Sequence, residues 1–206
     1  MLPSQFLKLT PSTPDEFIGP AGAIAKLLQR AVKDSTAAGK TPLTVLFNGP
    51  PGIGKSALAR YLIGLLGSDK WSVKKYSGND VNIDTVRDIA ADLHYKDLFG
   101  NWRVLWIEEA DLIPAAAQNR FLMLLDDLPQ GCAVICTSNC KVDDFQKRFQ
   151  TRFKIYDVEP PQPQEIENLL RRWLTRPQDL KNISIMSCGC VRQALLDAET
   201  CLQAAA

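Results

Sequence analysis

A glycine-rich loop between an apolar stretch and a helix-like stretch is the feature that most constrains how this sequence folds. The loop follows the pattern G-x-x-x-x-G-K-S and consists of Gly49, Pro50, Pro51, Gly52, Ile53, Gly54, Lys55 and Ser56. It follows the apolar residues 43–47, and Ala57 opens a helix-like stretch. Backbone N–H groups at a helix N-terminus lack intrahelical partners and can hold phosphate oxygens. The pattern therefore predicts a strand, a phosphate-binding loop and a helix in succession.

The residue types in this loop predict a nucleoside triphosphate and Mg²⁺ as its ligands. The glycines let the backbone wrap around the phosphates, Lys55 reaches the β- and γ-phosphates, and the Ser56 hydroxyl is a ligand for Mg²⁺. We therefore expect residues 49–57 to bind ATP together with Mg²⁺. The preference for ATP over GTP depends on a family resemblance alone.

The composition is that of a globular protein outside membranes. The 206 residues are 46% hydrophobic and 23% charged, and the net charge is +1. No apolar stretch approaches the ~20 residues that span a bilayer, and the N-terminus lacks a basic segment followed by an apolar one. We therefore expect a cytoplasmic protein with no membrane partner. The charge argues against a broadly basic nucleic-acid-binding surface but allows a local one.

The cysteine pattern agrees with that location. None of the six forms a C-x-x-C pair, and they are Cys132, Cys136, Cys140, Cys188, Cys190 and Cys201. Their spacings fit no usual zinc site. We expect reduced thiols in a reducing compartment.

Strand-like and helix-like stretches alternate along most of the chain. Apolar stretches predict strands at residues 43–47, 71–76, 104–107, 133–137 and 154–158. Helices are predicted at residues 21–32, 57–67, 85–93, 115–125 and 142–149, with Asp84 as the N-cap of the third. This alternation predicts an α/β fold: a three-layer P-loop fold with a central, mostly parallel sheet covered by helices on both faces.

Prolines at positions 160, 161 and 163 mark a predicted domain boundary. Residues 1–159 form the predicted nucleotide-binding α/β domain, and residues 160–206 form a small helical lid domain. The stretches 165–174 and 191–202 are expected to be the first and last helices of that lid.

Two acids follow the apolar stretch at residues 104–107. Acids at the carboxyl end of a parallel strand lie where α/β sheets bind ligands. One of the two carboxylates, Glu108 or Glu109, is predicted to hold Mg²⁺ through water, and its neighbour to polarise the attacking water.

Several more segments match one family in its own order. Residues 49–56 and 104–109 correspond to its Walker A and Walker B motifs, and the further matches are residues 17–19 (with Phe17 and Ile18 at the adenine pocket), 115–129, 136–139, 149–153 and 188–195. With these motifs the chain resembles the AAA+ ATPases, specifically the clamp-loader branch of DNA replication. That branch includes the delta-prime and gamma subunits of DNA polymerase III and the small subunits of replication factor C.

The resemblance implies a hydrolytic site that two subunits complete. Asn139 corresponds to sensor 1, which contacts the γ-phosphate or the attacking water, and Arg192 corresponds to sensor 2 on the lid. Arg152 corresponds to the arginine finger that enters a neighbour's site, where it can raise the rate ~10³–10⁵-fold. Arg148 is the competing candidate for the finger. The implied partners are further copies of this chain or related subunits.

The resemblance also implies a DNA contact. Residues 77–87 are similar to a clamp-loader segment whose helix faces the central DNA. Asn82, Thr85 and Arg87 could hold a phosphate backbone without reading bases. The alternative is that Arg87 pairs with Asp84 or Asp88 on a solvated helix face.

Three departures from the family pattern bear on function. Glu108 stands where the family usually has the aspartate that holds Mg²⁺ through water, so slow turnover is expected, and Glu109 corresponds to the acid that polarises the attacking water. Residues 151–153 read Thr-Arg-Phe in place of Ser-Arg-Cys. The sequence ends after the sensor 2 helix, without the collar that holds clamp-loader pentamers together. We therefore expect any ring to depend on AAA+ contacts or on a partner protein.

These observations predict an ATP-hydrolysing oligomeric switch on DNA, similar to a clamp loader or a helicase loader. One alternative is a nucleotide-gated adaptor that hydrolyses little and recruits an effector protein. Another is a ring that remodels proteins, for which residues 94–99 offer aromatic side chains away from the usual place of a pore loop.

Overall fold

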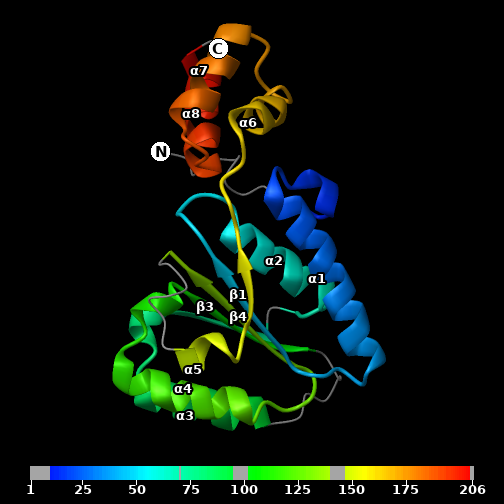
Figure 1. Ribbon diagram of the computed structural model, residues 1–206, viewed down its shortest axis with the longest axis vertical. Coiled ribbons are helices and arrows are strands. Elements are labelled where there is room, and N and C mark those ends of the chain that lie inside the picture. Colours follow the sequence, from blue (N-terminus) through cyan, green and yellow to red (C-terminus); the bar gives the residue numbers. More distant parts are fainter. Residues whose placement is uncertain (1–9, 70, 95–101, 140–146, 205–206) are drawn as a thin grey trace.

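A five-stranded sheet forms the centre of the computed structural model, which describes residues 10–69, 71–94, 102–139 and 147–204 (Figure 1). The strands are β1 (Leu43–Asn48), β2 (Val73–Ser77), β3 (Arg103–Glu108), β4 (Cys132–Ser138) and β5 (Lys154–Asp157). They lie in the order β2-β3-β4-β1-β5, and all four neighbouring pairs are parallel. The predicted parallel sheet is confirmed, with all five strands within two residues of their expected bounds.

The strand order brings the ends of β1, β4 and β3 to one edge of the sheet. Asn48 at the end of β1 lies opposite Ser138 of β4, and Ile107 of β3 lies opposite Cys136. The loop at residues 49–54 and the acids after residue 107 therefore leave the sheet at the same edge. In open parallel sheets, this is the edge where ligands bind.

Helices cover both faces of this sheet. On one face lie α1 (Pro20–Ala37) and α2 (Lys55–Leu65); on the other lie α3 (Ile83–His94), α4 (Ala115–Asp126) and the short α5 (Lys147–Gln150) (Figure 1). All seven residues of β4 are buried, as expected of a strand that packs on both faces. Side chains of β1 alternate between the two cores: Phe47 packs with α2, whereas Leu46 packs with α3 and α4.

The start of α3 corrects one prediction. The Asn82 side chain accepts hydrogen bonds from the Thr85 N–H at 2.8 Å and from the Thr85 hydroxyl at 3.1 Å, so Asn82 is the N-cap and the helix begins at Ile83. The prediction of Asp84 as N-cap was wrong, because Asp84 already lies in the first turn. Residues 142–146 of another predicted helix lie outside the described residues.

Among the described residues, short 3₁₀ helices also lie at Pro14–Glu16, Gly78–Asp80 and Ala110–Leu112. The last of these follows Glu109, whose backbone is left-handed with φ of 54°. A Cβ added to Gly78 would lie 2.0 Å from the Glu109 carbonyl oxygen. The close approach of these two turns explains why glycine stands at position 78.

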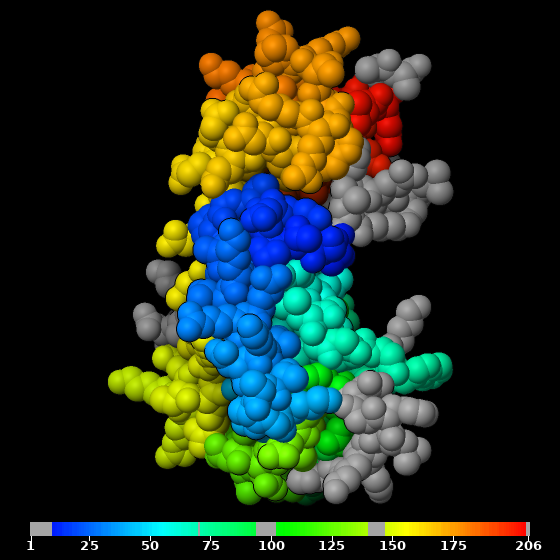
Figure 2. Space-filling view, turned by 90° about the vertical axis from the view of Figure 1, so that its right-hand side faces the viewer, coloured from blue at the N-terminus to red at the C-terminus, as the bar shows by residue number. Residues whose placement is uncertain are grey.

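The last three helices pack around a cluster of their own. They are α6 (Pro163–Leu170), α7 (Pro177–Met186) and α8 (Val191–Ala204), and Figures 1 and 2 show them at one end of the molecule, beyond the N-terminal end of α1. Helix α6 ends four residues before its predicted limit. The division into two domains after residue 159 stays a prediction. No helix among the described residues is long and apolar enough to cross a membrane.

Candidate nucleotide-binding site

The loop between β1 and α2 is built so that only glycine fits at two of its positions. Gly49 has φ of 142°, and a Cβ there would lie 2.3 Å from the Val158 carbonyl oxygen. Gly52 has φ of 79°, and a Cβ there would lie 2.3 Å from the Cys190 sulfur. The loop therefore packs between the end of β5 and the start of α8, with its backbone directly available to a ligand.

Lys55 is held inside this loop by the loop's own backbone. Its Nζ donates to the carbonyl oxygens of Gly49 at 2.7 Å and Pro50 at 2.6 Å. Lys55 is only 7% exposed, although its ammonium is the group predicted to bind phosphate. An incoming phosphate would replace these two neutral acceptors with a charged one, which makes a stronger hydrogen bond.

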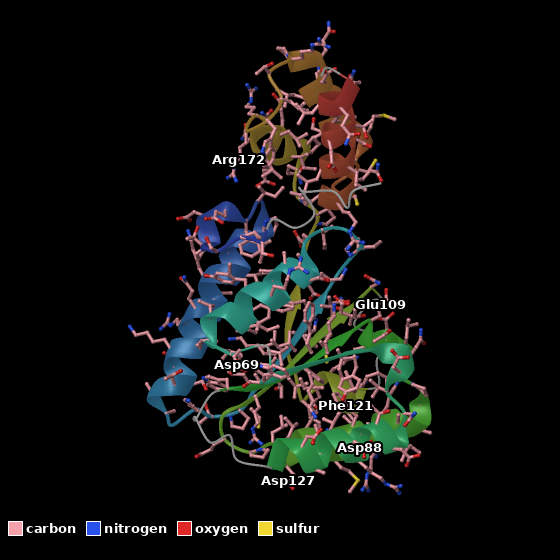
Figure 3. The ribbon with its side chains drawn as sticks, turned by 180° about the vertical axis from the view of Figure 1, so that it is seen from behind. Asp69, Asp88, Glu109, Phe121, Asp127 and Arg172 are labelled. Atoms are coloured by element: carbon pink, nitrogen blue, oxygen red, sulfur yellow. The ribbon has the colours of Figure 1, made fainter. Side chains whose placement is uncertain are left out.

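The charges around Lys55 identify which predicted residues face it. The pKa of Lys55 is lowered to about 8, chiefly by burial, and the positive charge of Arg192 contributes to this lowering. The negative charges of Asp111 and Glu109 act on the same pKa in the opposite direction. The charges of Arg192 and Glu109 therefore act on Lys55, which places the predicted sensor 2 and the predicted water-polarising acid near the loop lysine. Figure 3 shows Glu109 at the end of the sheet from which the loop leaves.

This lowered pKa predicts that ATP affinity falls in alkaline solution. Phosphate binding requires the protonated lysine, and bound phosphate raises its pKa above the free value of about 8. Affinity is therefore fully present below about pH 8 and should fall by up to about tenfold per pH unit above it. Fluorescence titration with a labelled ATP analogue at constant free Mg²⁺ and ionic strength measures the effect. An affinity that stays flat to about pH 9.5 would contradict this assignment.

Glu108, the last residue of β3, and Glu109, the residue after it, point in different directions. Since Val104 and Trp106 pack on the α2 face of the sheet, alternation along the strand places Glu108 on that same face. Its carboxylate forms an ion pair with Lys75, with 2.7 Å between Oε2 and Nζ. Glu109 is exposed, and its N–H donates to the Thr137 hydroxyl at 3.3 Å.

Asp111 is a site residue that the sequence did not single out. Its Oδ1 accepts a hydrogen bond from the Asn139 N–H at 3.2 Å, so it joins the turn after β3 to the end of β4. The structure thus brings the predicted sensor 1 residue next to an acid that acts on Lys55. The signal was present in the sequence, since Asp111 is the third acid among residues 108–111.

The start of α8 rests directly on the phosphate-binding loop. The Arg192 N–H donates to the Gly52 carbonyl oxygen at 3.0 Å, beside the Cys190 sulfur that packs against Gly52. The side chain of Arg192 is exposed at this position. The predicted lid residue therefore lies next to the loop in the same chain.

Residues 17–19 connect the loop's helix with the last three helices. The Phe17 ring packs edge-on against Tyr61 of α2, with 5.3 Å between centroids, while Ile18 packs on the cluster of α6–α8. A Cβ on Gly19 would lie 2.9 Å from the Cβ of Pro161. The predicted adenine-pocket residues thus lie between the two parts of the chain, and their contact with adenine stays a prediction.

Arg152 lies away from this site. The Thr44 hydroxyl, near the start of β1, donates to the Arg152 carbonyl oxygen at 2.6 Å. Five residues of strand, about 16 Å, separate Thr44 from the loop at Gly49. The guanidinium forms a bidentate pair with Asp126 at the end of α4, with two bonds of 2.7 Å, and also donates to the Arg148 carbonyl oxygen. Arg148 itself is exposed.

The predicted DNA-contacting residues are occupied within their own helix. Asn82 and Thr85 form the cap of α3, and Arg87 pairs with Asp84 at 3.0 Å. This is the alternative expected for Arg87, on a helix that also carries Asp92 and the exposed Asp88, which is labelled in Figure 3. A direct DNA contact by this segment stays a prediction.

The donor atoms present fit ATP with Mg²⁺. Ser56 lies in the first turn of α2, and Glu108 ends β3 at the same edge of the sheet, so the site offers a hydroxyl and a carboxylate oxygen. Within the described ranges, no three His, Cys, Asp or Glu residues gather into a site that could hold a metal alone. Mg²⁺ typically binds through one or two protein oxygens together with substrate phosphates and water, which is the kind of site seen here.

The chain is similar in sequence to subunits of clamp loaders and of replication factor C. A sliding-clamp-loader large subunit of Enterobacteria phage T4 is 28% identical over 171 residues, which are 82% of this chain and 51% of that protein. A replication factor C small subunit of Methanococcus maripaludis is 26% identical over 168 residues, 79% of this chain and 51% of that protein. The chain spans about half the length of these curated relatives.

Solved structures and a family model agree on the fold. The RuvB Holliday junction branch migration motor of Thermotoga maritima superimposes with a TM-score of 0.76 at 23% identity, over 95% of this chain and 65% of that one. The model of the "ATPase family associated with various cellular activities (AAA)" matches residues 45–159, more than half of the chain. That span runs from β1 past the end of β5 and includes the loop, Glu108, Glu109 and Asn139. The chain therefore belongs to the AAA family of ATPases.

Proposed function

We propose that this chain binds and hydrolyses ATP with Mg²⁺ and acts as an oligomeric switch on DNA in replication or recombination, as a clamp-loader-like or helicase-loader-like ATPase. The observation that supports it best is the split arrangement of the predicted catalytic groups. The charges of Glu109 and Arg192 act on Lys55. The Arg152 backbone instead lies beside Thr44, and about 16 Å of β1 separates Thr44 from the loop. A site that needs Arg152 must receive it from another subunit.

Each group has a defined task in this proposal. The loop N–H groups hold phosphate oxygens, and Lys55 exchanges its two carbonyl acceptors for the β- and γ-phosphates. Glu109 orients and polarises the attacking water, while Asn139 and Arg192 bind the γ-phosphate. Arg152 of a neighbouring subunit stabilises the charge that develops in the transition state. Mg²⁺, when bound by Ser56 and, through water, Glu108, would neutralise phosphate charge.

The DNA part of the proposal is supported by the names of the relatives. The phage T4 relative is a sliding-clamp-loader subunit, and a Rhodococcus erythropolis relative, 31% identical over 58% of this chain and 30% of its own length, is the RuvB subunit of a Holliday junction branch migration complex. Both names refer to machinery that acts on DNA. We propose the same class of substrate here, together with a protein partner of unknown identity.

Size measurement in solution tests the proposal as a whole. We expect the mass from light scattering to rise above that of a monomer with ATP and Mg²⁺, but not with ADP or without nucleotide. Duplex DNA should strengthen ATP-dependent assembly and accelerate hydrolysis. A chain that stays monomeric under all conditions and still hydrolyses ATP at the same rate would contradict it.

A second candidate function is a nucleotide-gated adaptor that hydrolyses ATP slowly and recruits an effector protein. The Lys75–Glu108 ion pair favours this adaptor function, because Lys75 occupies the carboxylate that would serve Mg²⁺, and hydrolysis would then be slow. ATP-dependent assembly without measurable hydrolysis, with or without DNA, would identify this function. For the third alternative, a protein-remodelling ring, the aromatic residues after His94 lie outside the described residues.

A further inference from the structure

Lys75 on β2 makes two contacts at the acidic end of β3. Strand register places Lys75 opposite Trp106 and Ser77 opposite Glu108. The Lys75 ammonium lies 2.7 Å from Oε2 of Glu108 and 4.1 Å from the centroid of the Trp106 ring. A cation over the face of a tryptophan is attracted by the ring, so the two contacts hold the ammonium in one place.

These contacts lie on the face of the sheet that α2 covers. Trp106 packs in the same cluster as Leu58 and Leu62 of α2, the helix that begins with Lys55. The preceding residue, Lys74, points to the opposite face and pairs with Asp92 of α3. Of these two adjacent lysines, Lys75 pairs with the acid expected to serve Mg²⁺, and Lys74 pairs with an acid on the other face.

We propose that Lys75 is an internal counter-ion that competes with Mg²⁺ for Glu108 and so raises the Mg²⁺ concentration needed for full ATP binding. The inference rests on the proposed function, in which Glu108 serves Mg²⁺ through water. The ammonium occupies one carboxylate oxygen, and its charge repels a divalent cation brought to the same group. Glu108 can serve Mg²⁺ through water only when its ion pair with Lys75 breaks.

The size of the effect follows from the exposure of the pair. The side chains of Lys75 and Glu108 are 47% and 31% exposed, so solvent screens their attraction. Pairs of this kind are weak, and the competition should change the required Mg²⁺ concentration by only about two- to fivefold. Lys75 would thus raise the Mg²⁺ concentration needed for ATP binding by a small factor without preventing that binding.

Binding of a fluorescent ATP analogue, titrated with Mg²⁺, tests this inference without measuring turnover. Lys75→Met keeps the aliphatic stem over Trp106 but removes the charge, and Lys75→Gln provides a second uncharged variant. We expect both to lower the half-maximal Mg²⁺ concentration about two- to fivefold. Lys75→Arg, which retains the charge, should behave like the original chain. Lys74→Met is the matched control, because it changes net charge equally on the other face, and it should cause no shift.

The outcomes separate this inference from the proposed function. If the chain binds the analogue but Lys75→Met and Lys75→Gln leave the midpoint unchanged or raise it, the counter-ion role is wrong. An equal shift in Lys74→Met would also overturn it, since general charge would then be the cause. If the unaltered chain binds no analogue at any Mg²⁺ concentration, the proposed function fails and this inference fails with it.

Discussion

Replacing Arg152 with alanine is expected to lower the rate of ATP hydrolysis by about a thousandfold or more, with ATP affinity nearly unchanged. The loss should be confined to the chemical step, because Arg152 lies beside the start of β1 and far from the loop of its own chain. Its charge is needed only where a neighbouring subunit binds ATP. Steady-state phosphate release and equilibrium binding of a labelled ATP analogue measure the two quantities.

Mixing variants shows whether Arg152 acts between subunits. An Arg152→Ala subunit has an intact loop, and a Lys55→Ala subunit has an intact Arg152, so a mixed assembly contains some complete sites. We expect hydrolysis to reappear on mixing, although neither variant is active alone. Arg148→Ala is the matched control and should retain activity. If Arg148→Ala causes the loss instead, the finger was assigned to the wrong arginine.

The ion pair between Arg152 and Asp126 must be considered in that experiment. The guanidinium holds the pKa of the Asp126 carboxyl below its usual range, and the carboxylate raises the pKa of Arg152. Solvent-exposed pairs contribute little to folding stability, so Arg152→Ala should unfold at nearly the same temperature as the original chain. A large drop in Tm would assign Arg152 a structural role in joining α4 to the start of β5.

Replacing Lys55 with alanine should abolish measurable hydrolysis and weaken ATP binding by about a hundredfold or more. The buried ammonium is the positive charge inside the loop, and its charge-assisted bonds to the β- and γ-phosphates have no substitute in the variant. Isothermal titration calorimetry measures the loss. Lys33→Ala removes an exposed lysine from α1 and should leave affinity unchanged.

The same substitution gives a second readout in stability. Burial lowers the pKa of Lys55 to about 8 from 10.5, which means that folding disfavours the charged form at neutral pH. That penalty is fully present below pH 8 and disappears as the pH approaches 10.5. Lys55→Ala therefore should not lower Tm at pH 7. A strongly destabilised variant would show that Lys55 serves mainly to hold the loop together.

The parts of the fold that depend on local pattern were predictable. The strand before Gly49, the helix after Lys55 and the buried strand at residues 104–107 follow from short apolar stretches and glycine placement. A parallel sheet followed from the alternation of strands and helices. The start of α7 also had a local signal, Pro177 at its first position, which the sequence analysis did not use.

Other features depend on which segments become neighbours. The Lys75–Glu108 pair exists because β2 lies beside β3, and no spacing along the chain encodes that contact. Asn82 and Asp84 are both suitable N-caps, and only the path of the chain selects Asn82. The meeting of Asp111 with Asn139 likewise depends on β4 lying beside β3.

The hydrogen bond between the Gly52 carbonyl and the Arg192 N–H has a mechanical consequence. Gly52 is part of the loop that would close on phosphate, and Arg192 is the second residue of a helix about 20 Å long. A small rotation of the Gly52 peptide should tilt α8 through this hydrogen bond, and the displacement should grow with distance from Arg192. The far end of α8 is therefore where a change at the phosphates should produce the largest movement.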